Sequence, residues 1–376
     1  MSAQPGRGWR QTLIWPIVAW TAVSLSGCGE IDYYAQAIHG QFALLETARP
    51  VDTLLDSDHV DERLLRRLRL AEEIRTYAVK KLGLPDNGSY RKYADLKRPY
   101  VVWDVFAARA LSLRLKQSCF PIAGCVDYRG YYAYADADQY ARDLRRHGWE
   151  TFTVGVPAYS TLGYFDDPLL NTFLFDPEGE LARIIFHELA HQVVYVRGDT
   201  MFNESFAVTV AAVGVARWLR SHPRAAKAYD VVDRHRRAFQ ALIRRYRGRL
   251  AELYAGTLPP AQKEIEKRRI FHEVRMSYAR LRASWGGYAG FDRWIDSGLN
   301  NAKFGAFADY SQWVPAFRAL LAQQHGNLPA FYKAVKQLAA QPADKRHAEL
   351  NALAQGEVES SLSPEMGSQP SGGQAN

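Results

Sequence analysis

Two histidines and two glutamates near the middle of the chain have the types and spacing that can hold a metal ion and activate water. His187, Glu188 and His191 fall within one short segment, and Glu204 follows soon after. On an α-helix, residues four apart lie only about 40° apart around the axis, so the two imidazoles can share one cation. Glu188 is offset by about 100°, which prevents it from binding beside them but lets it reach a water on the metal.

This arrangement predicts the hydrolysis of a carbonyl compound by zinc-activated water. Zinc lowers the pKa of a bound water toward neutrality, and a neighbouring carboxylate can then accept the proton. Glu188 is the predicted general base, and it would return the proton to the departing amine as a general acid. Because a catalytic zinc usually has three protein ligands, His187 and His191 need one more partner, which we predict to be Glu204.

The residues around this site predict two consecutive helices. The segment from Glu180 to Val196 carries apolar side chains at helical spacing, and neither proline nor glycine interrupts it. Asp176 and Pro177 are the expected start of this helix. After a tight turn, Asn203 is the expected N-cap of a second helix, which places Glu204 in its first turn.

At this point the chain resembles a known class of enzymes, the gluzincin metallopeptidases. The segments 187–192 and 203–207, which read HELAHQ and NESFA, are similar to those of the M1 aminopeptidases. From about residue 30 to 340, the chain more closely resembles the bacterial "predicted aminopeptidase" lipoprotein family. The segments that carry this wider resemblance are 33–37, 119–125, 128–131, 158–165 and 299–302.

The resemblance implies a zinc peptidase with His187, His191 and Glu204 as ligands of one Zn²⁺ and Glu188 as the base. It also implies a gluzincin-like fold and a preference for aminopeptidase activity on peptide substrates. The chain departs from the M1 pattern in its shorter spacer after His191. It also lacks the Gly-x-Met-x-Asn segment, whose neighbouring glutamate binds the substrate amine in those enzymes.

Two alternative functions remain open at this stage. One is a zinc endopeptidase that acts on proteins of the bacterial envelope. The other is a non-catalytic envelope protein with a structural zinc ion. Glu188 argues against the second alternative, because a structural site has no need of a base and tends to close its fourth coordination position.

The segment 158–164, just ahead of the first ligand helix, is the predicted substrate-binding strand. In gluzincins the strand at this place pairs with the substrate backbone. The candidates for this contact are Tyr159, Ser160 and Gly163. Asp166 and the neighbouring Asp167 could hold a substrate α-amine, and a turn leading to Pro168 is the alternative explanation of these acids.

Residues beyond the metal site supply the remaining candidates. Peptidases of this type need a donor for the developing oxyanion, usually a tyrosine or histidine from the following domain, and Tyr310 is the candidate here. Asn300 and Asn301 are candidates either for substrate contact or for fixing a loop.

Residues 1–27 predict a targeting segment rather than part of the fold. Arg7 and Arg10 form its positive region, and the apolar run 13–25 is too short for a comfortable membrane span. The next residues resemble a lipobox, which implies cleavage before Cys28 and lipid attachment to its sulfur. These features predict a lipid-anchored protein of the bacterial cell envelope. Because Gly29, and not the aspartate associated with inner-membrane retention, follows Cys28, we expect it in the outer membrane, facing the periplasm.

Cys119 and Cys125 flank a loop that contains proline and glycine. In an exported protein such a pair is expected to form a disulfide. The alternative is a pair of buried free thiols. A zinc site built on these cysteines is less favoured, because no second pair of cysteines or histidines is nearby.

Composition and charge narrow the class of protein. The chain has 376 residues, of which 47% are hydrophobic and 12% aromatic, enough for the core of a globular protein with one or two domains. The formal net charge of +8 predicts a basic surface. The arginines are scattered along predicted helices and no nucleic-acid-binding motif occurs, so we expect no nucleic-acid partner. The family resemblance implies a peptide substrate, and the lipobox implies the membrane as a partner.

Hydrophobic periodicity predicts an α+β chain that is mostly α-helical. Strands are expected at 100–106, 130–134 and 151–156, as a small mixed sheet packed on the zinc-binding helix. The expected regions are a lipoprotein signal peptide (1–27), an N-terminal helical region (28–97), an α+β zinc-peptidase core (98–221), a C-terminal helical region (222–354) and a disordered tail (355–376).

Overall fold

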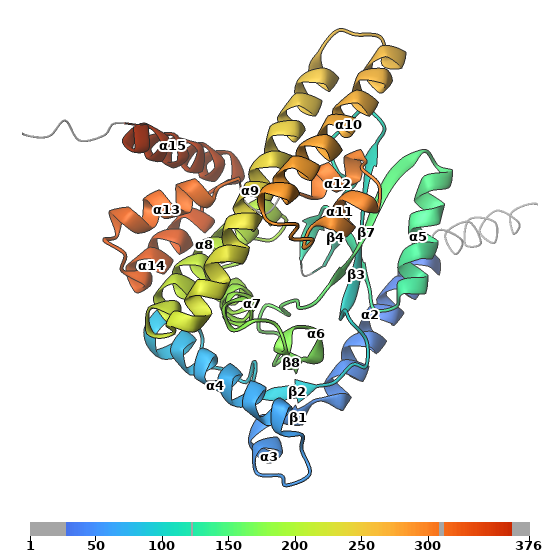
Figure 1. Ribbon diagram of the computed structural model, residues 1–376. Coiled ribbons are helices and arrows are strands. Elements are labelled where there is room, and N and C mark those ends of the chain that lie inside the picture. The colour runs from blue at the N-terminus through green and yellow to red at the C-terminus, as the bar shows by residue number, and fades with distance from the viewer. Residues whose placement is uncertain (1–27, 122, 308–311, 363–376) are drawn as a thin grey trace, which may run out of the picture. The chain divides into compact units, whose positions relative to one another are not determined.

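A computed structural model describes residues 28–121, 123–307 and 312–362 of the chain (Figure 1). Helices make up most of it and small sheets complete it, which confirms the predicted α+β, mostly α-helical class. Two compact units divide between Thr47 and Ala48. Helix α2 (Cys28–Thr47) represents the first unit, and every later element belongs to the second. No helix within the described ranges is long and apolar enough to cross a membrane.

The main sheet of the second unit has the strand order β6-β3-β7. Its strands are β3 (Val102–Arg109), β6 (Arg129–Tyr131) and β7 (Trp149–Val156), close to the three predicted segments. Both outer strands are antiparallel to β3. Helix α5 (Tyr134–Arg146) connects β6 at one edge of β3 to β7 at the other edge, so β6 and β7 have the same direction. The sheet is therefore antiparallel, and the prediction of a mixed sheet is wrong for these three strands.

Helices cover both faces of this sheet. The buried alanines of α5 pack on one face. On the other face, Phe106 and Ala108 pack against two alanines of α12 (Asn301–Ala306). Since alternate residues of a strand point to opposite faces, Asp104 shares the face of Phe106 and points away from α5.

The two remaining sheets are smaller. One is mixed and contains β1 (Arg49–Pro50), β2 (Lys92–Ala94) and β8 (Leu169–Leu170), with β2 antiparallel to β1 and parallel to β8. The other is a hairpin of β4 (Ser118–Phe120) and β5 (Gly124–Val126). A disulfide joins Cys119 to Cys125 across this hairpin, which confirms the predicted pair.

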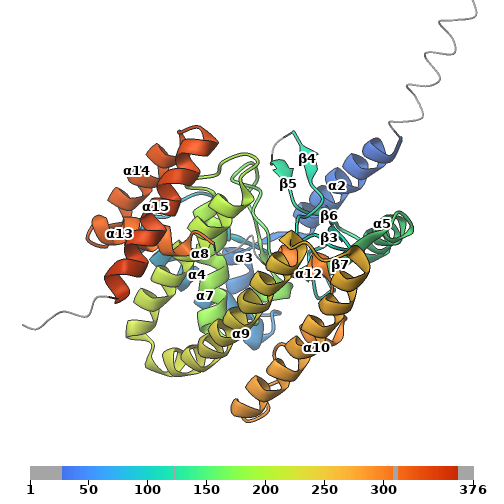
Figure 2. The same cartoon turned by 90° about the horizontal axis from the view of Figure 1, so that it is seen from above.

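Helices α7 (Glu178–His191) and α8 (Thr200–Trp218) lie side by side at the centre, with α4 (Glu62–Leu82) against them (Figure 2). The close approach depends on Gly214 of α8, because a Cβ there would lie 2.7 Å from the ring of Phe186 on α7. The last helices, α13 (Val314–Gln323), α14 (Leu328–Ala339) and α15 (Ala343–Leu362), complete this part of the chain. Rings on α13 and α14 pack against Phe206 of α8.

Helices α9 (Pro223–Ala255) and α10 (Pro260–Ser284) form the long antiparallel pair that the sequence predicts. Their apolar residues form a cluster that also contains Phe304 of α12, so this pair packs toward the main sheet. The short remaining elements are α3 (Val51–Leu55), α6 (Asn171–Leu174), the 3-10 helix η1 (Leu219–Ser221) and α11 (Asp292–Asp296).

The segments 158–164 and 355–362 differ from the prediction. Residues 158–164 form a turn rather than a strand, because Leu162 and Gly163 have left-handed φ values of 58° and 84° that interrupt an extended backbone. Helix α15 continues to Leu362, past the predicted start of the tail at residue 355. The other region boundaries stay predictions, since the compact units divide only at Thr47.

Candidate metal centre

Helix α7 carries two histidines and a glutamate of the predicted site. It ends at His191, earlier than the predicted Val196. Gln192 caps the helix, and the amide of Val196 donates to the side chain of Asn203 at 2.7 Å instead of continuing the helical ladder. The chain is therefore free to turn back toward the histidines after a short connection.

Helix α8 brings Glu204 to these histidines. Its N-cap is Asp199, whose carboxylate accepts from the amide of Phe202 at 3.2 Å, and not the predicted Asn203. Asn203 has a different role: its amide group bonds both the N–H and the C=O of Val196, at 2.7 and 2.8 Å. The residue before Glu204 thus fixes the connection between the two helices.

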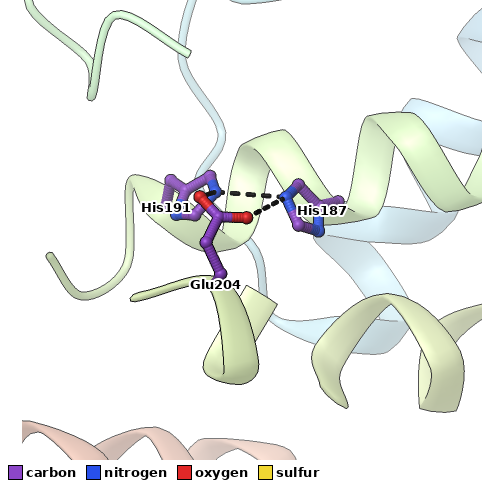
Figure 3. A group of neighbouring side chains, drawn as sticks. All are labelled: His187, His191 and Glu204. Atoms are coloured by element: carbon purple, nitrogen blue, oxygen red, sulfur yellow. Dashed lines mark hydrogen bonds and ion pairs between the residues drawn. The ribbon is translucent and has the colours of Figure 1, made fainter. Parts of the chain in front are cut away.

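The three candidate ligands converge on one point (Figure 3). The two Nε2 atoms lie 3.2 Å apart. His187 Nε2 lies 3.3 Å from one carboxylate oxygen of Glu204, and His191 Nε2 lies 3.5 Å from the other. Within the described ranges, these are the three His, Cys, Asp or Glu residues grouped closely enough to hold an ion.

These separations fit a tetrahedral zinc ion. With zinc–ligand bonds of about 2.0–2.1 Å, two ligand atoms of a tetrahedron lie about 3.3–3.4 Å apart. The three separations between His187, His191 and Glu204, from 3.2 to 3.5 Å, bracket this value. Two nitrogens and one carboxylate are also the donor set of many catalytic zinc sites, with one position left for water or substrate.

Burial and mutual charge set the protonation of the three residues. Burial lowers the pKa of His191 to about 4, so its imidazole is neutral and offers a lone pair. Burial also lowers the pKa of His187. The hydrogen bond to Glu204 and the negative charge of Glu204 outweigh burial, so the pKa of His187 is raised overall. Burial raises the pKa of Glu204, yet His191 and His187 hold it below the usual value, which keeps the carboxylate ionised.

Glu188 is 9% exposed and lies in the same electrostatic environment. Burial raises its pKa to about 7, the charge of His187 opposes this rise, and Glu204 and Asp167 reinforce it. A carboxyl group with a pKa near neutrality can both accept and donate a proton at pH 7. A divalent cation at the three ligands would draw this pKa down by Coulomb attraction.

Asp167 is a buried acid within electrostatic reach of Glu188. Its carboxylate accepts from the amide and the hydroxyl of Thr161, at 3.0 and 2.7 Å, and from Gln192 at 3.4 Å. Burial raises its pKa to about 6 against the effect of these hydrogen bonds. Asp167 therefore ties the turn that precedes it to the end of α7, and its hydrogen bonds give it a structural role.

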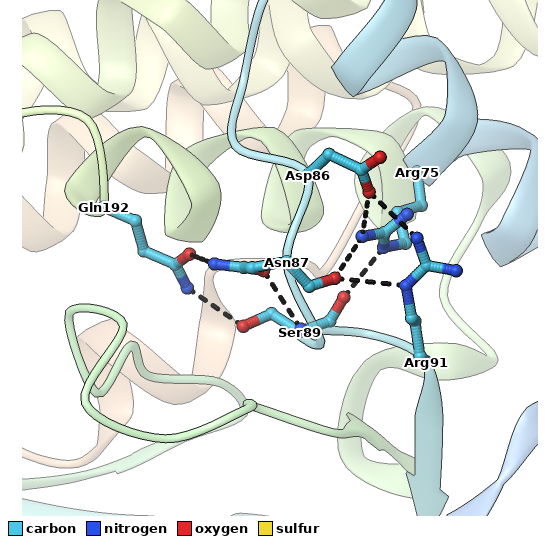
Figure 4. A network of polar contacts seen from close by, with 6 residues as sticks. All are labelled: Arg75, Asp86, Asn87, Ser89, Arg91 and Gln192. Carbon is cyan, nitrogen blue, oxygen red and sulfur yellow. Dashed lines mark hydrogen bonds and ion pairs between the residues drawn. The ribbon is translucent and has the colours of Figure 1, made fainter.

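A polar network extends from the end of α7 to the loop before β2 (Figure 4). The side chain of Gln192 accepts from Asn87 at 2.7 Å and donates to Ser89 Oγ at 3.2 Å. Arg75 of α4 holds the same loop, donating to the Ser89 carbonyl at 2.8 Å and to Asp86 at 2.9 Å. Gln192, which follows His191, is therefore held in place by a loop that Arg75 of α4 binds.

The predicted substrate-binding residues differ in their contacts and in their exposure. Ser160 lies 3.5 Å from Asp167, and Tyr159 shares a hydroxyl–hydroxyl hydrogen bond of 2.7 Å with Tyr132. Gly163 occupies the turn described above. Asp166 is exposed and its carboxyl group contacts Gly88, so the structure does not bring it to the three ligands.

The remaining candidates do not meet at this site. Tyr310 and the predicted signal peptide lie outside the described residues, and Cys28 is the first residue of α2. Asn300 donates to the carbonyl of Thr151 at 2.9 Å. Asn301 donates to the carbonyl of Ala110 at 2.6 Å and accepts from a tyrosine hydroxyl, so of its two predicted roles the loop-fixing one applies.

Two groups near the site escaped the sequence analysis. Asp104 of β3 is 7% exposed and has no hydrogen-bond or ion-pair partner among the described residues, and burial with the charge of Glu204 raises its pKa to about 7. Tyr90 has a left-handed φ of 64°, and its buried hydroxyl has no partner in the described part of the chain. An acid inside the apolar run of β3 is a visible signal, whereas no local pattern marks Tyr90.

Comparison with known proteins gives one match. A family model described as "Putative aminopeptidase" covers residues 32–350, which is most of the chain. The searches of curated proteins and of solved structures return no match.

Proposed function

Because the chain belongs to the "Putative aminopeptidase" family, which indicates a peptidase, we propose that it is a zinc-dependent aminopeptidase. The observation that carries the zinc dependence is the convergence of His187, His191 and Glu204 at 3.2 to 3.5 Å. These residues would hold one Zn²⁺, in agreement with the gluzincin resemblance of the sequence.

The catalytic step depends on one metal and one carboxylate. A bound zinc ion supplies Lewis acidity, which lowers the pKa of water and polarises the peptide carbonyl. Glu188 is adjacent in sequence to His187, is buried, and has a pKa raised to about 7. It accepts the proton of the attacking water and returns it to the departing amine.

Aminopeptidase activity also requires a group that recognises the free α-ammonium of the substrate. Asp104 is suited to this role, because its buried carboxyl group lacks a counter-charge and lies within electrostatic reach of Glu204. An ammonium group would supply that counter-charge. In this role Asp104 takes the place that the sequence analysis offers to Asp166.

Hydrolysis of amino-acyl reporters by the zinc-loaded chain tests the catalytic assignment. Glu188→Gln keeps the shape of the side chain and removes its basicity, so we expect it to retain one zinc ion per chain and to lose activity by about 10²–10⁴-fold. Metal content by atomic emission separates loss of chemistry from loss of metal. Equal activity in parent and variant would exclude this mechanism.

The substrate assignment needs a second comparison. We expect Asp104→Asn to raise KM for a peptide with a free N-terminus by at least tenfold, because about 1.4 kcal/mol of ion pairing corresponds to tenfold. The same peptide with an acetylated N-terminus should be hydrolysed poorly by both proteins. Efficient cleavage of internally quenched, N-acetylated peptides would instead indicate an endopeptidase.

The proposed location is the bacterial cell envelope, with a lipid on Cys28 as the anchor to the outer membrane and the peptidase in the periplasm. A disulfide between Cys119 and Cys125 supports an oxidising compartment of this kind. We expect the expressed full chain to partition into detergent, and Cys28→Ser to release it to the soluble fraction. A variant that stays with the membrane would refute the anchor.

A further inference from the structure

The disulfide hairpin of β4 and β5 lies directly on the connection between the two ligand helices. This connection runs from Gln192 to Asp199, and it sets where Glu204 lies relative to the two histidines. The amide of Gly198 donates to the carbonyl of Ala123 in the hairpin at 3.0 Å. The hydroxyl of Tyr195 reaches the same carbonyl at 3.5 Å.

The contact between hairpin and connection leaves no spare room. A Cβ on Gly124 would lie 2.5 Å from the amide nitrogen of Gly198 and 2.9 Å from its Cα. Both atoms belong to the backbone, so they cannot rotate away as a flexible side chain could. Gly124 also has a left-handed φ of 79°, which glycine adopts most readily.

Residues of the connection also contact the helix ends that carry His191 and Glu204. On the α7 side, the ring of Tyr195 packs edge to face with His191, at a centroid separation of 6.3 Å. On the α8 side, Asn203 holds Val196 and is followed by Glu204. A shift of the connection therefore displaces His191 and Glu204 relative to each other.

The hairpin needs the disulfide to keep a stable structure. Its two strands have three residues each, and an isolated two-stranded hairpin of this size is marginally stable in water. The bond between Cys119 and Cys125 joins the strands directly beside Gly124.

We propose that the disulfide-closed hairpin is a positioning element of the metal centre. It holds the connection between α7 and α8 so that Glu204 stays at metal-binding distance from His187 and His191. The inference rests on the proposed zinc site, and it adds that zinc affinity depends on residues that do not touch the ion. Outer contacts of this kind typically change metal affinity by about 10–100-fold.

The test compares two glycine substitutions in the full chain. Gly124→Ala and Gly286→Ala both place a side chain at a left-handed φ, of 79° and 66°, but only Gly124 has atoms within 4 Å of the new Cβ that belong to the connection. We expect Gly124→Ala to weaken zinc binding at least tenfold in competition with a chromogenic chelator. We expect Gly286→Ala to bind zinc within about twofold of the parent.

A second variant keeps the test decisive if Gly124→Ala fails to fold. The double substitution Cys119→Ser and Cys125→Ser should also weaken zinc binding at least tenfold, while far-ultraviolet circular dichroism shows the helices intact. Parent-like zinc affinity in a folded Gly124→Ala or in the double variant would overturn the positioning role. A parent chain that binds no zinc would instead overturn the proposed function.

Discussion

The ion pair between Asp199 and Arg346 offers a quantitative test of how the helix that carries Glu204 is held. Arg346 of α15 donates two hydrogen bonds to one carboxylate oxygen of Asp199, at 3.0 and 2.7 Å. The two side chains are only 6% and 9% exposed. Asp199 is also the N-cap of α8, so one residue anchors α8 to the C-terminal helices and starts its first turn.

The expected loss of stability follows from these contacts. Removing one partner of a buried pair leaves the other charge buried without compensation, at a cost of about 3–5 kcal/mol. Asp199→Asn should cost about this much, because asparagine caps helices as well as aspartate does. Asp199→Ala also loses the cap, which adds about 1 kcal/mol. Adding Arg346→Met to Asp199→Asn removes the uncompensated charge and should restore about 2 kcal/mol.

Urea unfolding of the metal-free chain measures these differences without a contribution from zinc. The exposed pair of Arg66 and Glu62, with side chains 63% and 87% exposed, supplies the control. Arg66→Ala should change the free energy of unfolding by less than about 1 kcal/mol. The reasoning would be refuted if Asp199→Ala lowered the free energy of unfolding by less than about 1 kcal/mol. It would also be refuted if the double variant were less stable than Asp199→Asn by about a further 3–5 kcal/mol, the cost of removing one buried partner.

Further expectations concern metal, pH and packing. Zinc at a hundred times its Kd should stabilise the chain by about 2.7 kcal/mol, and neither chelator nor zinc should shift the unfolding midpoint of Glu204→Ala. The folded pKa of Asp167, raised to about 6, exceeds its ordinary value of 3.8, so its ionisation opposes folding. The metal-free chain should therefore lose about 3 kcal/mol from this group as pH rises from about 4 to about 6, and urea unfolding of Asp167→Asn should show a flatter profile. Gly155→Ala meets the ring of Tyr100 and should cost about 1–3 kcal/mol, measurable by urea unfolding against the parent. Gly248→Ala, with open space around the new Cβ in the middle of α9, should stabilise the chain by about 0.5–1 kcal/mol in the same assay.

The pattern of residues within short segments predicted the ligand helix, two strands of the main sheet and the disulfide. The apolar periodicity around His187 predicted a helix with both histidines on one face, and the structure has their Nε2 atoms 3.2 Å apart. Short apolar runs predicted β3 and β7, and the proline- and glycine-containing loop between Cys119 and Cys125 predicted their disulfide in an exported protein. The two histidines and the two cysteines interact across only four and six residues, and each strand was recognised from its own residues although β3 and β7 pair across a long separation.

Local pattern failed where two nearby side chains compete for one role. Asp199 and Asn203 are both good N-cap residues, and sequence rules alone do not choose between them. The structure assigns the cap to Asp199, because Arg346 and His347 hold that carboxylate from α15. Asn203 is then free to bind the backbone of Val196, which also ends α7 early.

By itself, the sequence determined which residues could hold a metal, because a helical repeat of four residues and a following helix bring those side chains together through short-range geometry. Only the tertiary structure decided what surrounds them. The charge interaction of Asp104 with Glu204 and the hydrogen bond from the Gly198 amide to the Ala123 carbonyl join segments far apart in the chain. Such contacts arise when the sheet, the hairpin and the helices pack, and no periodicity along the chain encodes them.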